Sequence, residues 1–135
     1  MIMLPYPPSV NRYWRNFRGR MVRSREAVDY KEAVRAIASE CIAAPLEGCV
    51  KVVLVLHPPR PLDAARRAKK DHRWVLNVRR IDLDNAMKVA LDSLQEIAFF
   101  NDRQITNLEI RLGVPVVDGG LSVVVCPDLL WEHPV

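Results

Sequence analysis

Two aspartates one residue apart, Asp82 and Asp84, occur in the stretch RRIDLDNAMKVALDSLQ at residues 79–95. In an extended segment, side chains two positions apart point to the same face, so both carboxylates would lie close together. Like charges at such a distance repel each other, and a divalent cation between them removes the repulsion. Mg²⁺ is commonly held by one or two carboxylates together with water and substrate phosphate. The pair therefore predicts a magnesium site, although Asp-x-Asp alone is a weak motif.

Two further residues are candidates for the same site. Lys88 follows Asp84 by four positions and so lies one helical turn away on the same face, where its ammonium could stabilise charge during phosphodiester cleavage. Asp102, in the stretch FFNDRQI, closes the site if the helix returns the chain to the same edge of the sheet. The alternative is structural: Lys88 is then a surface lysine paired with Asp84 or Asp92, and Asp84 is a simple helix cap.

Basic residues are concentrated in two segments, although the net charge is only +4. Residues 12–25 hold six arginines and no acid, and residues 60–80 hold eight basic residues against two aspartates. Uneven positive charge, rich in arginine, favours contact with a phosphate backbone. The alternative is a pair of solvated basic loops. The residues predicted to bind DNA are Arg12, Tyr13, Arg15, Arg18, Arg20, Arg79 and Arg80. The aromatic residues Tyr13, Trp14 and Phe17 either stack on DNA or pack the loop.

The order of elements predicts an α+β fold, with one mixed sheet and two main helices packed on it, in a single domain of residues 1–135. Strands are expected at residues 1–8, 49–57 and 105–113, and as a hairpin at 116–126 turned at Asp118-Gly119-Gly120. One helix follows a cap at Ser24 and ends near residues 45–48, and another follows a cap at Asp84. Residues 58–80 are expected to form a basic, exposed excursion.

Several classes of protein are disfavoured. No apolar run approaches the roughly 18 residues of a membrane span, and the amino-terminal residues do not resemble a secretory signal. Three cysteines without a CxxC spacing suggest a reduced, cytoplasmic protein rather than a disulfide or zinc framework.

Three separated motifs resemble the RusA family of Holliday-junction resolvases. They are LPYPPSVNRYWRNFRGR, DLDNAMKVALDSL and FFNDRQI, in this order and at a compatible length. The resemblance implies a homodimeric, Mg²⁺-dependent endodeoxyribonuclease, with Mn²⁺ as an alternative ion, that nicks four-way DNA junctions symmetrically in recombination and repair. It also implies a nucleoid-associated protein of the kind often carried by phages and prophages. The family's metal-binding aspartates match Asp82, Asp84 and Asp102, and its essential lysine matches Lys88.

The sequence departs from the family pattern at three places. Ile81 stands where an arginine can precede the first aspartate, the segment 60–80 is longer than the usual basic connection, and Asn101 stands where a second acid is expected. Two alternative functions remain open: a Mg²⁺-dependent nuclease for another DNA structure, and a non-catalytic module that binds branched DNA. The second would be expected to have lost an aspartate or the lysine, and all four are present.

Overall fold

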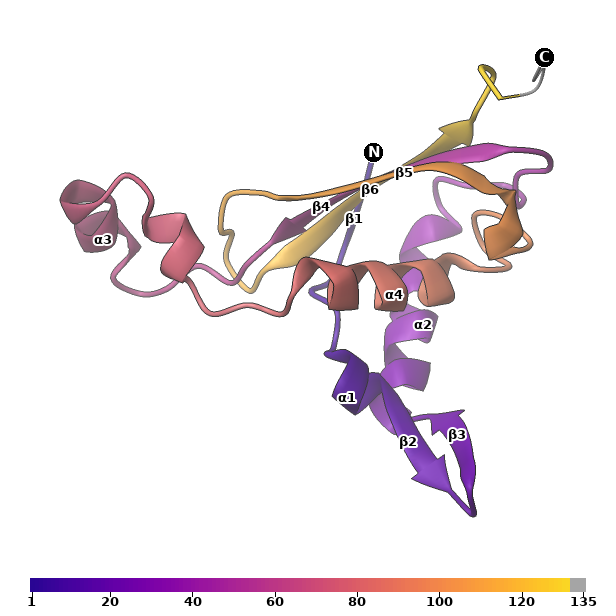
Figure 1. The fold of residues 1–135 in the computed structure, drawn as a ribbon, viewed down its shortest axis with the longest axis horizontal. Helices are drawn as coiled ribbons and strands as arrows, with labels where there is room; N and C mark the ends of the chain where they lie inside the picture. The colour runs from indigo at the N-terminus through magenta and orange to yellow at the C-terminus, as the bar shows by residue number, and fades with distance from the viewer. Residues whose placement is uncertain (132–135) are drawn as a thin grey trace.

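Four strands form the main sheet of the computed structural model, which describes residues 1–131 (Figure 1). They are β1 (Ile2–Leu4), β4 (Val50–His57), β5 (Ile105–Leu112) and β6 (Gly120–Pro127). The order across the sheet is β1-β6-β4-β5. β4 pairs with β5 in parallel and with β6 antiparallel, and β1 pairs with β6 antiparallel. The mixed sheet expected from the sequence is confirmed.

Two helices, α2 (Arg25–Ala38) and α4 (Leu83–Leu94), pack on one face of this sheet. The central strand β4 alternates strictly, so that every second side chain is buried beneath the helices. The main core joins these strand residues to apolar side chains of both helices. Its fully buried members on β4 and the helices are Val34, Ala38, Val50, Val52, Leu54, Leu56, Ala86, Ala90 and Leu94.

The path from β4 through α4 to β5 decides where the two ends of α4 lie. β4 and β5 are parallel neighbours, with Val50 opposite Ile105. The chain must therefore return along the sheet between the end of β4 and the start of β5, and α4 makes this return. As a result, the amino end of α4 lies near the end of β4, and its carboxyl end lies near the start of β5 (Figure 1).

The arginine-rich amino-terminal segment forms more structure than the expected loop. A short helix, α1 (Val10–Tyr13), leads into a hairpin of β2 (Trp14–Phe17) and β3 (Arg20–Arg23). The turn residues Arg18 and Gly19 both have positive φ, 52° and 78°, as a two-residue hairpin turn of the mirror-image type requires. The hairpin projects away from the sheet beside α2 (Figure 1).

Residues 58–80 form a projection that we call the arm. It contains α3 (Ala64–Lys70) and a 3₁₀ turn, η1 (Trp74–Asn77), and it extends from the end of the molecule where β4 finishes (Figure 1). Its base is attached to the body: the Arg60 N–H donates to the Val116 carbonyl at 2.8 Å, and Pro59 forms a bridge with Val116. Within the arm, Pro58, Ala64 and Val78 are buried, and the other residues are exposed or half-buried.

Three details differ from expectation. α2 ends at Ala38 rather than near residues 45–48, although Ser24 does cap it by accepting from the Ala27 N–H. The residue that caps α4 is Asp82, and Asp84 lies inside its first turn. The turn at Asp118 and Gly119 is present, but β6 pairs with β1 and β4 instead of closing a local hairpin, because only the bridge at Val116 precedes the turn. Among the described residues, none of the helices is both long and apolar enough to cross a membrane.

Candidate active site

Asp82 and Asp84 both stand at the amino end of α4. Asp82 occupies the cap position with extended backbone angles of −68° and 150°, and Asp84 lies in the first turn. Neither of the two is buried. The cap carboxylate of Asp82 does not accept a hydrogen bond from its own helix. The unpaired N–H groups of a helix start attract negative charge, which lowers the cost of holding two carboxylates there.

The alternative of a local ion pair for Lys88 is not what the structure shows. Lys88 is exposed, and within residues 1–131 none of the ion pairs joins it to Asp84 or Asp92. Asp82 and Asp84 likewise have no basic partner among the described residues. The two carboxylates and the ammonium are therefore available to a ligand from outside the chain.

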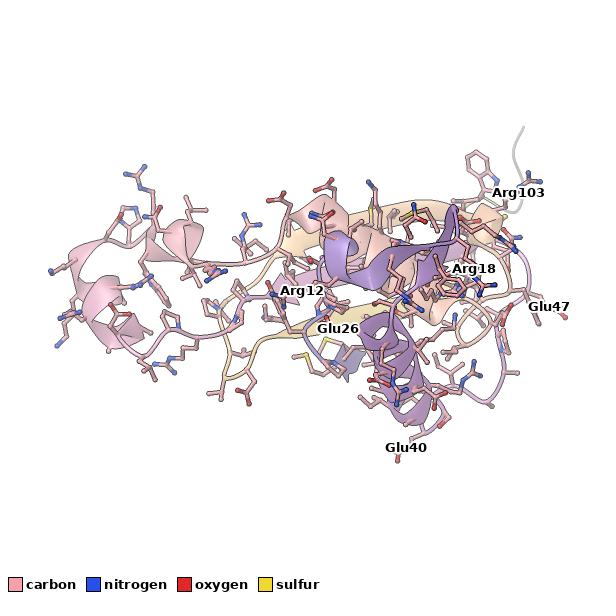
Figure 2. All side chains as sticks on the ribbon, turned by 90° about the horizontal axis from the view of Figure 1, so that it is seen from below. Arg12, Arg18, Glu26, Glu40, Glu47 and Arg103 are labelled. Carbon is pink, nitrogen blue, oxygen red and sulfur yellow. The ribbon has the colours of Figure 1, made fainter. Side chains whose placement is uncertain are left out.

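Asp102 lies at the other end of α4. It opens the 3₁₀ turn η2 (Asp102–Gln104), which leads directly into β5. A helix of the 12 residues of α4 is about 18 Å long, and Asp102 is reached only after it. Figure 2 shows its neighbour Arg103 at the end of the molecule opposite the arm, whereas Asp82 follows the arm directly. One chain does not bring Asp102 to Asp82 and Asp84.

The donor set fits a hard divalent cation in part. In the described part of the chain, no three His, Cys, Asp or Glu side chains gather closely enough to enclose a metal ion. The pair of Asp82 and Asp84 supplies oxygen ligands, which Mg²⁺ prefers, and Mg²⁺ keeps several waters when protein ligands are few. Two carboxylates that form no ion pair within the described residues are suitable for such an ion, and a third ligand must come from elsewhere.

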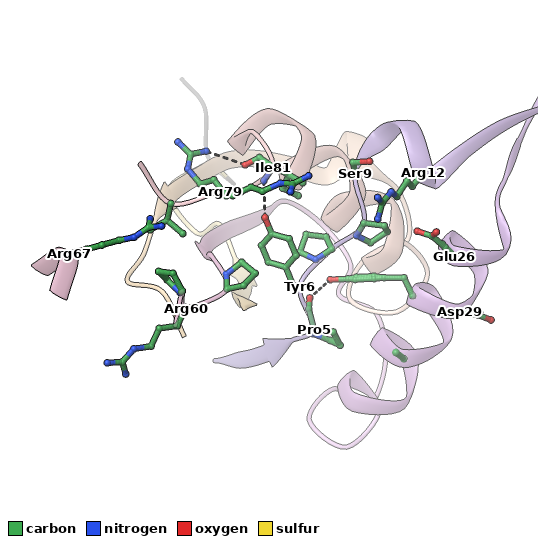
Figure 3. A pocket seen from close by; sticks show the side chains of 18 residues that line it. Pro5, Tyr6, Ser9, Arg12, Glu26, Asp29, Arg60, Arg67, Arg79 and Ile81 are labelled. Carbon is green, nitrogen blue, oxygen red and sulfur yellow. Dashed lines mark hydrogen bonds between the residues drawn. The ribbon is translucent and has the colours of Figure 1, made fainter. Parts of the chain in front are cut away.

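Arginine side chains line a hollow whose wall includes the residue before Asp82. The hollow has a volume of about 1060 Å³ and is lined by Ile81, Arg79 and Arg80, which immediately precede Asp82, and by Arg12 from the segment of α1 (Figure 3). The Ile81 N–H donates to the Tyr6 hydroxyl at 2.8 Å, which attaches this approach to the amino-terminal segment. Three of the predicted DNA-binding arginines are thus close to the aspartate pair.

The other predicted arginines, Arg15, Arg18 and Arg20, are exposed on the hairpin. Phe17 is 47% exposed, and the guanidinium groups of Arg15 and Arg18 lie over its ring at 5.3 and 5.2 Å from the ring centre. These cation–π contacts form a cationic, partly aromatic surface at the hairpin tip.

Tyr13 does not belong to that surface. Its side chain is 0% exposed and packs with Ala27 and Val89, so it has no face to offer a base. Its hydroxyl donates to Asp92. The structure favours the packing alternative for Tyr13, and its proposed contact with DNA is replaced by a structural role.

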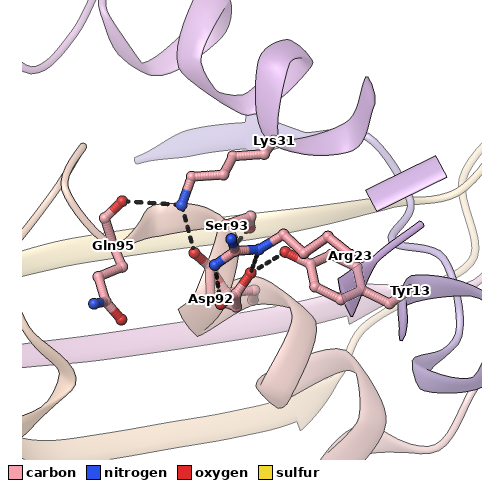
Figure 4. Close-up of polar contacts among 7 residues, drawn as sticks. Tyr13, Arg23, Lys31, Asp92, Ser93 and Gln95 are labelled. Carbon is pink, nitrogen blue, oxygen red and sulfur yellow. Dashed lines mark hydrogen bonds and ion pairs between the residues drawn. The ribbon is translucent and has the colours of Figure 1, made fainter. Parts of the chain in front are cut away.

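The environment of Asp92 was not predicted from the sequence. Asp92 accepts hydrogen bonds from Tyr13 and from both Nε and Nη2 of Arg23, at 2.9 and 2.8 Å for the arginine (Figure 4). Lys31 of α2 donates to the backbone carbonyls of Asp92 and Gln95 at 3.0 and 3.3 Å, where the last carbonyls of α4 lack helical partners. We call Tyr13, Arg23, Lys31 and Asp92 the hairpin anchor, because they join α1, β3 and α2 to α4.

The pKa shifts within the hairpin anchor favour the ionised forms of Asp92 and Arg23. Burial acts to raise the pKa of the Asp92 carboxyl, but the hydrogen bonds from Arg23 and Tyr13 outweigh it and hold that pKa below its usual range. Burial, followed by the hydrogen bond to Asp92, raises the pKa of Tyr13. The contact with Asp92 also raises the pKa of Arg23. Burial lowers the pKa of Lys31. A partly buried carboxylate needs partners of this kind to remain ionised.

Part of the FFNDRQI motif has a folding role. The Asn101 side chain accepts from the Arg103 N–H, and the Gln104 carbonyl oxygen Oε1 accepts from the N–H groups of Phe100 and Asn101. Together they form a capping box around η2. Asn101, which stands where the family pattern has a second acid, therefore has a local structural partner, while Asp102 beside it is exposed.

Comparison with known proteins identifies the family. The family model described as Endodeoxyribonuclease RusA matches residues 5–125. The chain is 35% identical over 121 residues to a protein of Escherichia coli strain K12 named crossover junction endodeoxyribonuclease RusA, covering 88% of this chain and 86% of that protein. It is 34% identical over 121 residues to the protein of the same name from Enterobacteria phage 82, with the same coverage. The chain therefore belongs to the RusA family of endodeoxyribonucleases.

Proposed function

We propose that this endonuclease resolves four-way DNA junctions by paired symmetric nicks, in a reaction that depends on Mg²⁺ and for which Mn²⁺ substitutes. The single observation that carries the proposal is the unpaired, exposed Asp82 and Asp84 at the amino end of α4, beside an arginine-lined hollow. The names of the relatives support the substrate, since both act on crossover junctions according to those names.

Each residue of the proposed site has a definite role. Asp82 and Asp84 hold the cation, which supplies charge neutralisation and a nucleophilic water when bound. Lys88, exposed one turn further along α4, contacts the scissile phosphate and stabilises the charge that develops on it. Arg12, Arg79 and Arg80 bind the backbone next to the scissile phosphate, and Arg15, Arg18 and Arg20 bind it from the hairpin.

Asp102 completes the site only from a second chain. About 18 Å of α4 separate it from Asp82 within one chain, so an intramolecular role would require α4 to break. In a dimer with two-fold symmetry, two antiparallel copies of α4 would place the Asp102 end of one beside the Asp82 end of the other. We therefore propose a homodimer with two composite sites, which also matches a substrate that has paired strands to cut. The relative from phage 82 supports a phage or prophage origin, with action on DNA in the bacterial cytoplasm.

The decisive experiment compares cleavage of an end-labelled four-way junction with cleavage of linear duplexes of the same arm sequences, with and without Mg²⁺. Symmetric paired nicks in the junction alone, abolished by EDTA, are the expected result. Equal cleavage of flaps or duplex would instead identify a nuclease for another DNA structure. Tight junction binding without nicks, under Mg²⁺ and Mn²⁺ and across several junction sequences, would identify a binding module.

A further inference from the structure

The arm buries little of its own surface. Of its residues, only Pro58, Ala64 and Val78 are buried, while Leu62 and Leu76 are exposed. Its helix α3 has seven residues, fewer than the roughly 12 that an isolated helix needs to be stable in water. The carboxylate of Asp63 helps to hold it, through ion pairs with Arg66 and Arg67 at 3.4 and 2.9 Å. Folding alone gives the arm little stabilisation, which points to a partner.

One side of the arm forms a wall of the arginine-lined hollow. Arg60, Arg67, Arg79 and Arg80 line it from the arm, and Arg12 lines it from the body (Figure 3). Two acids, Glu26 and Asp29, also line it from the start of α2, and Asp29 is paired with Arg25 at 3.3 Å. Arginines outnumber acids among the lining residues, so the hollow attracts anions. Ile81, the residue before Asp82, is also among its lining residues.

The lining favours a backbone over unstacked bases. The aromatic residues among the described lining residues are Tyr6 and Tyr30, and both hydroxyls are engaged, with the Ile81 N–H and the Pro5 carbonyl respectively. Tyr30 is moreover buried. Proteins that hold single strands offer exposed aromatic rings on which bases stack, whereas duplex backbones are held by guanidinium groups and need no such rings.

We propose that the arm binds the phosphate backbone of one duplex branch of the DNA, through Arg60 and Arg67, and guides the adjoining strand to Asp82. This inference rests on the proposed function for the identity of the DNA. It assigns a role to the segment that is longer than the usual basic connection of the family, and it adds two residues to the DNA-binding set. The arm, through Arg60, Arg67, Arg79 and Arg80, acts as one side of a channel that Arg12 of α1 lines from the body.

The test compares Arg60→Gln with Lys69→Gln. Both substitutions remove one positive charge from the arm, and within the described chain neither side chain is in an ion pair. Arg60 lines the hollow and Lys69 does not. The Arg60 backbone N–H keeps its bond to Val116 in the variant, so the base of the arm is preserved. Arg67→Gln is a second variant, with circular dichroism to check that α3 survives.

The measurement is the salt dependence of junction binding. The slope of log K against log salt is negative, and each lost phosphate contact reduces its magnitude by about 0.9. We expect Arg60→Gln and Arg67→Gln each to reduce this magnitude by about one unit, while Lys69→Gln leaves the slope unchanged. Equal slopes for Arg60→Gln and Lys69→Gln would overturn the proposal. So would a loss confined to single-stranded DNA. If the natural chain fails to cleave junctions, the proposed function fails, but a slope change specific to Arg60 and Arg67 on linear duplex would still support the arm.

Discussion

Asp82 and Asp84 stand where the start of α4 attracts negative charge and where the described structure offers no basic side chain to neutralise them. A DNA phosphate that approaches this point without a metal ion meets two exposed carboxylates. If Asp82 and Asp84 hold the proposed cation, they oppose DNA binding in its absence and support it in its presence. Opposite effects on DNA binding with and without the cation would distinguish a metal-binding role of Asp82 and Asp84 from a purely structural one.

The first prediction concerns Asp82→Asn. We expect at least a ~100-fold loss of junction cleavage, because one of the groups that stabilise transition-state charge is removed. We expect junction binding without added metal to tighten by up to about fivefold, because removing one unit charge near a phosphate at the surface is worth about 1 kcal/mol. Electrophoretic mobility shift in EDTA and a cleavage assay in Mg²⁺ measure the two effects.

The matched control is Asp118→Asn, which removes the same charge from an exposed turn outside the site. Asn tolerates the positive φ of 63° found there. Cleavage by this variant should equal that of the natural chain. Full cleavage by Asp82→Asn would remove the metal-ligand role.

Gln104 connects the motif FFNDRQI to the segment that leads into β4. Its amide nitrogen donates to the carbonyls of Leu46 and Gly48 at 2.8 and 2.9 Å, and its amide oxygen accepts the two N–H groups of the capping box. We predict that Gln104→Ala lowers the free energy of unfolding by about 2 kcal/mol, because several polar groups lose their partners at once. Thermal unfolding measures this loss.

Arg103→Ala is the control for Gln104→Ala, since the Arg103 side chain is exposed and makes no hydrogen bond or ion pair with other described residues. It should leave the unfolding midpoint within a degree or two of the natural chain. Equal midpoints for the two variants would show that the capping box contributes nothing to stability.

At the scale of elements, the hairpin anchor determines how the arginine-rich hairpin is held. None of the eight residues of β2 and β3 is buried: Trp14 and Val22 are half-buried, and the other six strand residues are exposed. Its orientation depends on Arg23, which reaches Asp92 on α4 and also lies over the Trp14 ring at 5.6 Å. The helix that carries Asp82, Asp84 and Lys88 therefore also fixes the hairpin arginines.

Asp92→Asn is predicted to lower the free energy of unfolding by about 1–3 kcal/mol at neutral pH, the usual cost of breaking a charge-assisted network that is partly buried. The Asp92 carboxyl has a lowered pKa in the fold, so its contribution is complete above the unfolded pKa of about 3.9 and is lost as pH falls through the folded value. The difference in stability between the natural chain and the variant should thus be constant from pH 6 to 8 and narrow below about pH 4. Urea unfolding over this pH range measures it.

Asp29→Asn provides the comparison for Asp92→Asn. It breaks the exposed pair with Arg25, whose side chain is 90% exposed, and such a pair is worth little. We expect a change of less than about 0.5 kcal/mol from Asp29→Asn. A pH-independent difference for Asp92→Asn would contradict the ionised state of Asp92.

The sequence predicted those elements whose pattern is local. The alternation of β4, the cap at Ser24 and the exposed segment 58–80 all follow from neighbouring residues. What it did not predict depends on distant partners. Tyr13 looked like a surface aromatic among arginines, and only the packing of α1 on α4 shows that it is buried. Asp92 looked like a surface acid, and its partner Arg23 is 69 residues away.

The predicted site was affected by the same limitation. Asp82, Asp84 and Lys88 are close in sequence, so their shared position at the start of α4 follows from local structure. The expectation that Asp102 joins them required the chain after α4 to come back to the same edge. Because β4 and β5 are parallel, the chain after α4 must instead reach the opposite end of the strands, where β5 begins. Nothing in the local sequence signals this pairing.

At the scale of the whole molecule, the arm and α1 lie near the amino end of α4, whereas the hairpin lies beside α2 (Figure 1) and is bonded through Arg23 to Asp92 in the carboxyl-terminal half of α4. Glu47 and Arg103 lie at the opposite end, near the other end of α4 (Figure 2). One chain therefore presents two carboxylates and the arginines of the arm and α1 at one end of α4, and Asp102 at the other. A second chain in antiparallel orientation would make both ends complete at once.

The composite site is tested by mixing two inactive variants. If Asp102 acts across the dimer, a mixture of Asp82→Asn and Asp102→Asn chains forms mixed dimers in which one site carries both substitutions and the other carries neither. About a quarter of all sites should then be intact after random exchange, and each such dimer should nick one strand only. If each site were built within one chain, both sites of the mixed dimer would carry one substitution and no activity would return.

Mixing Asp82→Asn with Asp84→Asn is the control, because these residues belong to the same end of α4 and every site keeps one substitution in either arrangement. Recovery in the first mixture and none in the control would assign Asp102 to the partner chain, and no recovery in either would contradict the composite site.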